Sequence, residues 1–145
     1  MCMLAEHMHW YIKTPLFPIQ SLYDSWSLNN ILGIHCNKGR SLKGCNTSEM
    51  AYIEEYHKNT SKVLENIAAH PEHGYWAPTC VDHGYVWGML YSPDYEIPMH
   101  SNNTIDKTLL PWSQKKPGNH RYMDRGVWPD NKPCSDFSTP LLQAE

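Results

Sequence analysis

Apolar residues gather in two short runs, with a longer helical region between them. Residues 11–22 form the first run, and its apolar positions follow one another with little alternation. This is typical of a strand that is buried on both faces. Pro15 and Pro18 weaken this prediction, because proline removes a backbone donor and favours strand ends or edges. Residues 74–79 form the second run and predict a second short strand.

The region between the two runs predicts two helices. The shorter helix is expected over residues 25–34, with Ser25 as a possible cap. The longer helix is expected over residues 47–69, with Asn46 as its cap and Glu49 three residues on, as in a capping box. Its apolar face recurs at helical spacing: Ile53, Tyr56, Thr60, Val63, Leu64 and Ile67. Strand, helix and strand in this order are a βαβ unit, which implies parallel strands.

The last third of the chain gives a weaker pattern. A short helix is expected over residues 104–110, with Thr104 as its cap. Prolines interrupt the remainder at positions 93, 98, 111, 117, 129, 133 and 140. The predicted fold class is therefore α/β, with a βαβ unit followed by an irregular, proline-rich tail.

Length and charge exclude several classes of protein. A chain of 145 residues is long enough for one domain with a core. The formal charge of −3 shows no excess of basic residues, so we predict no nucleic-acid partner. No apolar run approaches the ~20 residues that span a bilayer, so we predict no membrane span. Residues 1–9 lack the basic start and long apolar stretch of a signal peptide.

Composition nevertheless favours a secreted protein, or a piece of one. Three sequons place candidate glycosylation sites at Asn46, Asn59 and Asn102. The five cysteines are an odd number, so in a secreted protein one of them would have no partner inside this chain. We therefore expect an extracellular location and a chain that is part of a longer protein.

Two titratable residues come just after the predicted strands. Asp24 follows the first apolar run and His83 follows the second. If the strands are parallel, both side chains lie at one edge of the sheet, where open α/β sheets bind ligands. The order Asp then His matches the last two members of an α/β-hydrolase triad. Simpler roles are also open, because Asp24 could cap the next helix and His83 could be structural.

A nucleophile is not evident in this sequence. The Gly-x-Ser-x-Gly elbow of α/β hydrolases is absent, and the nearest segment, residues 39–44, has the wrong spacing. Cys80 lies three residues before His83, but a secreted protein would more readily hold it in a disulfide.

Metal binding and carbohydrate binding are the rival interpretations. Three pairs have ligand-like spacing: His7 with His9, His70 with His73, and Cys80 with His83. No further half-site completes a tetrahedral zinc site, so we predict no metal and no cofactor. The aromatic residues that could line a carbohydrate or acyl pocket are Trp76, Tyr85, Trp87, Tyr91 and Tyr95.

Two segments carry a resemblance to a known family. Residues 11–17 lead to Tyr23-Asp24-Ser25-Trp26, and residues 77–83 read Ala-Pro-Thr-Cys-Val-Asp-His. Weaker counterparts are residues 103–105, residues 123–125 and Cys134. Over residues 2–134 the chain thereby resembles the C-terminal portion of the pectin acetylesterase/Notum family of serine carboxylesterases.

The resemblance implies a fold, a site and a reaction. It implies the C-terminal part of an α/β-hydrolase-like sheet, with residues 1–145 as a single partial domain. Asp24 would be the acid and His83 the base of a Ser-His-Asp triad. The serine and the oxyanion hole would belong to an N-terminal half that this chain lacks, so the chain alone is expected to be inactive.

The family also implies a substrate class. An ester would be cleaved, either on an acetylated polysaccharide such as pectin or on an acylated protein, as in Notum-like deacylation. The alternative is a non-catalytic, aromatic-rich binding module on a hydrolase-derived scaffold.

Disulfide pairing follows from the same resemblance. The plant members also have two loop cysteines before a long helix, which here correspond to Cys36 and Cys45, and their disulfide would close a short loop. A second disulfide is expected between Cys80 and Cys134, which leaves Cys2 for a partner in the missing half. The chain departs from several plant members at Gly84, where they have a further cysteine.

Overall fold

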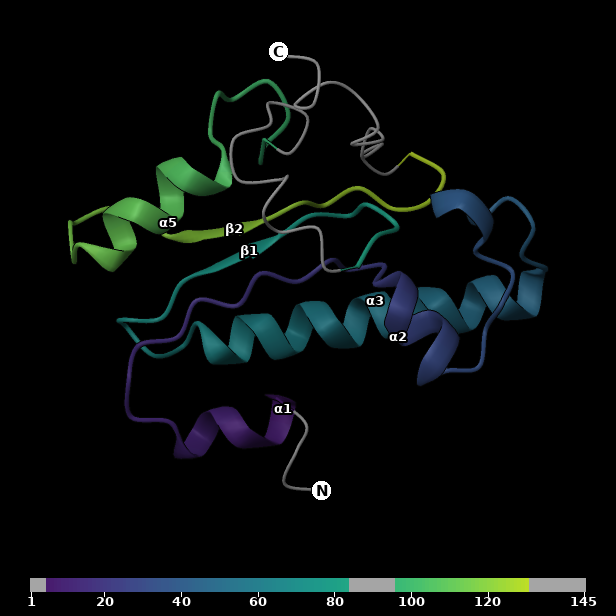
Figure 1. Ribbon diagram of the computed structural model, residues 1–145, viewed down its shortest axis with the longest axis horizontal. Coiled ribbons are helices and arrows are strands. Elements are labelled where there is room, and N and C mark those ends of the chain that lie inside the picture. Colours follow the sequence, from purple (N-terminus) through teal and green to yellow (C-terminus); the bar gives the residue numbers. More distant parts are fainter. Residues whose placement is uncertain (1–4, 84–95, 131–145) are drawn as a thin grey trace, which may run out of the picture.

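A computed structural model describes residues 5–83 and 96–130 (Figure 1). β1 and β2 pair in parallel, with Trp76 opposite Tyr122, so the described part is a mixed α/β arrangement. Its elements in chain order are α1 (Ala5–Met8), a 3-10 turn (His9–Tyr11), α2 (Ser25–Asn30), a second 3-10 turn (Lys38–Arg40), α3 (Thr47–Ile67), β1 (Tyr75–Ala77), α5 (Ile105–Ser113) and β2 (Arg121–Met123).

The strand predicted over residues 11–22 is an extended segment beside β1 rather than a regular strand. The Trp76 N–H donates to the Pro18 carbonyl at 2.9 Å, and the Gln20 N–H donates to the Trp76 carbonyl at 3.0 Å. These bonds make the segment parallel to β1, as the βαβ prediction required. Pro15 and Pro18 have no N–H, so a continuous ladder cannot form and the paired part is short.

Helices cover both faces of β1. Trp76 is fully buried and packs in one cluster with Ile105 of α5. The next side chain, Ala77, points to the other face and packs with Leu64 of α3 and Leu22. Figure 1 shows α3 and α5 on opposite sides of the strands. Burial on both faces is typical of parallel sheets, as the first apolar run also indicated.

The long helix predicted over residues 47–69 is α3, which ends two residues earlier at Ile67. Both bonds of its capping box are present: the Glu49 N–H donates to Asn46 Oδ1 at 3.0 Å, and the Asn46 N–H donates to Glu49 Oε2 at 2.8 Å. The helix buries four side chains: Ile53, His57, Leu64 and Ile67. Burial of the His57 imidazole was not predicted.

The C-terminal elements differ from prediction in length. The helix predicted over residues 104–110 extends to Ser113 and contains Pro111. β2 was not predicted, because three residues are too few to show an alternating pattern.

No helix in the described ranges combines the length and apolar character that crossing a membrane requires.

Cys36 and Cys45 form a disulfide, as the sequence predicted. It closes the loop between α2 and α3, where Leu42 packs into the same buried cluster as Tyr23 and Leu28. The bond therefore constrains the loop that follows α2, in which Asn37 Nδ2 donates to the Ser25 carbonyl at 3.3 Å.

Candidate active site

Asp24 and His83 meet although 59 residues separate them in the chain. Oδ2 of Asp24 lies 2.7 Å from Nδ1 of His83. Asp24 is 4% exposed, whereas the His83 side chain is 48% exposed. A carboxylate can only accept a hydrogen bond, so the contact selects the tautomer in which Nδ1 carries the proton, and in the neutral imidazole of that tautomer Nε2 has the lone pair. The pair is thus a buried acid that orients a solvent-accessible base.

Asp24 is held by the helix that it begins. It is the N-cap of α2, and its Oδ1 accepts the Ser27 N–H at 2.7 Å. Oδ2, the oxygen that faces His83, also accepts from Gln20 Nε2 at 3.1 Å. Ser25, which the sequence allowed as the cap, is instead the first residue of the helix. The two roles considered for Asp24 are therefore compatible, because each uses a different oxygen.

His83 is held from its backbone and from one ring face. Its N–H donates to Asp82 Oδ1 at 2.7 Å, and the Asp82 carbonyl accepts the Ser25 N–H at 3.1 Å. The Trp26 ring stacks on the imidazole, with centroids 5.7 Å apart and planes inclined by 26°. The loop after β1 is thus tied to the first turn of α2, which fixes the imidazole beside Asp24.

Asp82 is a second buried carboxyl beside the pair. It is 1% exposed, and its Oδ1 lies 3.8 Å from Arg40 Nε. Burial raises the pKa of Asp82, while the His83 amide and the Arg40 charge act in the opposite direction. Burial also raises the pKa of Tyr56, whose hydroxyl hydrogen-bonds to Ser27 and lies near the Asp24 charge.

Asp82→Asn is expected to change how stability depends on pH. Because its pKa is raised, folded Asp82 keeps its proton more tightly than the unfolded chain, so stability falls as pH rises above about 4. The amide cannot ionise, so the variant should lose less free energy of unfolding than the unmodified chain between about pH 4 and pH 7. Urea unfolding at both pH values measures this, with Asp130→Asn as the exposed control. Equal losses in all three chains would contradict it.

The other candidate residues have structural contacts. Cys80 is disulfide-bonded, which removes it as a thiol nucleophile; its predicted partner Cys134 lies outside the described residues, as does Cys2. The His70 and His73 rings stack at 4.2 Å, and each Nδ1 accepts a backbone N–H.

One further group of potential metal ligands in the described residues contains the two cysteines of the disulfide. Cys36, Cys45 and Glu49 bring their ligand atoms within 4.8 Å of one another. Both sulfurs are bonded in the disulfide, however, so they cannot act as thiolate ligands.

The candidate glycosylation sites and aromatic residues are distributed over the surface and the core. Asn46, Asn59 and Asn102 are all exposed. A glycan on Asn46 would use Nδ2 and leave Oδ1 free to cap α3.

Of the aromatic residues that could line a pocket, Trp76 is a core residue. The remaining aromatic candidates lie outside the described residues: Tyr85, Trp87, Tyr91 and Tyr95.

Sequence reasoning missed three residues that position the pair. Gln20 donates to Asp24, Trp26 stacks on His83, and Asp82 binds the His83 amide. The spacing of Gln20 was no signal, because a turn at residues 22–23 separates it from Asp24. The Trp26 and Asp82 contacts depend on tertiary packing between α2 and the loop after β1, which no local pattern encodes.

The fold and the pair define an α/β protein with a carboxylate and an imidazole just beyond parallel segments, an arrangement typical of acyl-transfer enzymes. A profile of the pectinacetylesterase family matches residues 1–135. The chain belongs to the pectinacetylesterase family, which confirms the resemblance found in the sequence.

A curated relative agrees with this assignment. The chain is similar to pectin acetylesterase 7 of Arabidopsis thaliana, with 23% identity over 120 residues. The match covers 77% of this chain and 31% of that protein, so the chain spans about a third of the length of the relative. No solved structure matches the chain.

Proposed function

We propose that this chain supplies the base and the orienting acid of a serine carboxylesterase that deacetylates a polysaccharide such as pectin. The 2.7 Å contact between buried Asp24 and accessible His83 is the observation that carries the proposal. Membership of the pectinacetylesterase family and similarity to a protein named pectin acetylesterase support acetyl esters as the substrate.

The geometry gives each member of the pair a defined task. His83 Nε2 takes the proton of a serine hydroxyl as that oxygen attacks the ester carbonyl. The same nitrogen then returns the proton to the sugar oxygen that leaves, and an acetyl-enzyme remains. Water hydrolyses this intermediate through a second cycle on His83. Asp24 holds the Nδ1–H tautomer throughout and stabilises the imidazolium each time it forms.

In this proposal the nucleophile and the oxyanion donors come from a part of the protein outside these 145 residues. The chain has no Gly-x-Ser-x-Gly segment, and the curated match leaves more than half of the relative without a counterpart here. The pair needs no metal or cofactor for this chemistry. The 145 residues alone are therefore expected not to turn over an ester.

The same proposal places the protein outside the cell. The disulfide between Cys36 and Cys45 is of a kind that persists in oxidising compartments. The three exposed sequon asparagines are accessible to glycosylation.

Acetate release and serine labelling test the function together. The protein that carries this chain should release acetate from acetylated pectin, and a fluorophosphonate should label one serine and stop the release. Labelling without acetate release contradicts acetylated pectin as the substrate, and release that a fluorophosphonate leaves untouched contradicts a serine nucleophile. If the 145 residues alone hydrolyse an activated acetyl ester and lose this activity in His83→Ala, the nucleophile lies inside the chain. Sugar binding with neither labelling nor release favours the non-catalytic binding module.

A further inference from the structure

A cleft of about 650 Å³ lies at the opposite ends of the strands from the Asp24–His83 pair. Its walls come from the turn before β1, the end of α5 and the loop that leads into β2. Neither Asp24 nor His83 lines it. Its volume falls within the range of about 300–1,000 Å³ that is usual for small-ligand sites. The lining residues that matter here are Glu72, Trp112, Lys115, Lys116, His120 and Arg121.

The cleft has the opposite charge to the chain as a whole. Among the described residues it is lined by Lys115, Lys116 and Arg121, against the carboxylate of Glu72, whereas the chain carries a formal charge of −3. Arg121 is fixed by backbone carbonyls, with Nη2 3.0 Å from the carbonyl oxygen of His70. Carbonyls orient the guanidinium without neutralising it. A concave group of like charges concentrates ions of opposite sign, so the cleft favours an anion.

One wall of the cleft is flat and apolar. Trp112 is held by its indole N–H, which donates to the Glu72 carbonyl at 2.8 Å, and by its ring, which lies 5.1 Å from that of Phe17. Pro71 and Pro117 line the cleft beside it. A fixed indole of this kind offers a face on which the C–H side of a sugar ring can stack.

His120 forms part of the wall of the same cleft. Its Nε2 lies 2.8 Å from the Lys116 carbonyl and donates to it, which holds the ring beside the two lysines. Nδ1 is buried, so it is not offered to a ligand in the cleft. A basic lining beside an apolar ring face suits a carboxylate-bearing sugar better than phosphate or sulfate, which have no apolar face to stack.

We propose that this cleft binds a carboxylate-bearing sugar residue of a polysaccharide, at a distance from the ester that is cleaved. The inference builds on the proposed function, because it assigns a second contact to the same substrate. The cleft lies at the start of β1, and the Asp24–His83 pair lies beyond its end. Residues 73–79 run between the two places, so the distance between them is roughly 20 Å at about 3.3 Å per residue. An oligosaccharide can reach both places, whereas a small ester cannot.

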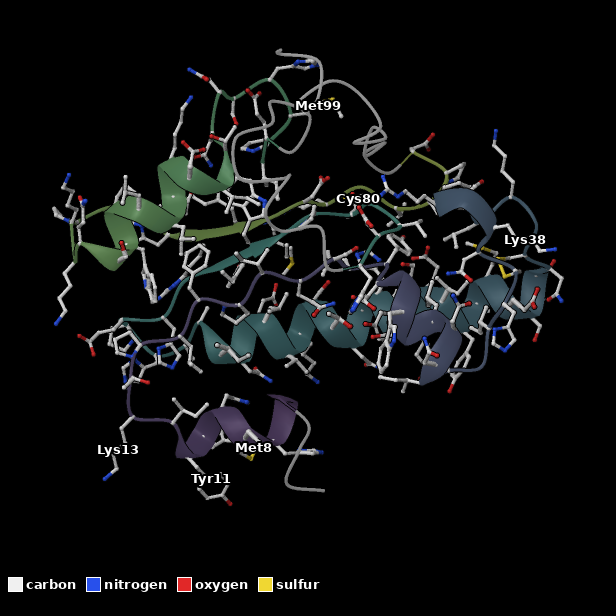
Figure 2. All side chains as sticks on the ribbon, in the orientation of Figure 1. Met8, Tyr11, Lys13, Lys38, Cys80 and Met99 are labelled. Atoms are coloured by element: carbon white, nitrogen blue, oxygen red, sulfur yellow. A yellow bond between two sulfur atoms is a disulfide. The ribbon has the colours of Figure 1, made fainter. Side chains whose placement is uncertain are left out.

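Calorimetric titration with galacturonate oligomers that carry no ester groups tests this binding separately from catalysis. Replacing both lysines, Lys115→Gln with Lys116→Gln, should weaken binding about fivefold, the effect of two exposed charge pairs. The matched control is Lys38→Gln with Lys43→Gln, which removes the same charge from exposed lysines in the loop between α2 and α3. Figure 2 shows Lys38 at the end of the molecule away from α5. Neutral galactan oligomers of equal length should bind more weakly than the acidic ones.

Three results would overturn the site. The first is that both double lysine variants weaken oligomer binding equally, and the second is that neutral oligomers bind as tightly as acidic ones. The third is that sulfate displaces the bound oligomer as effectively as galacturonate does. A second pair of variants distinguishes failure of the proposed esterase function from failure of the proposed cleft. His83→Ala should abolish ester hydrolysis in the protein that carries this chain and leave oligomer binding intact, whereas the Lys115/Lys116 variant should hydrolyse a small acetyl ester normally.

Discussion

His83→Ala is expected to lower kcat/KM for an acetyl ester by about 10⁴-fold or more in the protein that carries this chain. In the proposed mechanism the imidazole is the base that makes the serine nucleophilic and the acid that releases the sugar oxygen, so both halves of the reaction lose their proton carrier. KM should change little, because the ring contacts Asp24 and Trp26 rather than a substrate pocket in the described residues.

The measurement is steady-state hydrolysis of a small activated acetyl ester, with urea unfolding of each variant. His35→Ala is the matched control, because His35 is exposed and lies in the loop between α2 and α3. His35→Ala should keep the unmodified rate. His83→Ala also takes a hydrogen-bond partner from the buried Asp24 carboxylate, so the free energy of unfolding should fall by about 1–3 kcal/mol, and the urea curves show that the protein assayed is still folded. An unchanged rate in His83→Ala would remove it from the mechanism.

Asp24→Asn is expected to lower kcat by about 10⁴-fold while the protein stays folded. The amide no longer stabilises an imidazolium and can offer Nδ2–H to His83, which selects the wrong tautomer. Asparagine is as good an N-cap as aspartate, however, and its Oδ1 can still accept the Ser27 N–H. The substitution thus separates the two roles that the Asp24 oxygens play.

Asp24→Ala completes the comparison. It removes the cap of α2 as well as the partner of His83, so it should add a loss of about 1 kcal/mol in the free energy of unfolding. Rates and urea midpoints of the two variants show which role is lost in each. If Asp24→Asn kept its rate, or lost rate only because it unfolded, the contact with His83 would have no part in the chemistry.

Local signals determined which elements were predicted well. α3 was predicted to within two residues, because a capping box and an apolar face at helical spacing mark its start and its orientation. The first strand was overestimated, because apolar composition predicts burial, whereas Pro15 and Pro18 decide whether a ladder can form. β2 needed pairing with β1, a contact between distant parts of the chain.

The candidate site could be predicted only in part, for similar reasons. The positions of Asp24 and His83 after two apolar runs located both residues, since parallel segments end at one edge of a sheet. The pattern did not decide between a helix cap and a partner of His83, because that choice depends on where each oxygen of Asp24 points. The stacking of Trp26 and the basic cleft at the other end of the strands depend on tertiary packing, so the sequence alone did not indicate them.

A double-mutant cycle at Asp24 and His83 tests most directly whether the two residues act as one unit. The rates of acetyl-ester hydrolysis are compared for the unmodified protein, Asp24→Asn, His83→Ala and the double variant. Once His83 is absent, Asp24 has no imidazole to orient, so the double variant should be no slower than His83→Ala alone. If the two losses instead multiplied, Asp24 and His83 would act independently and the proposed pair would be wrong.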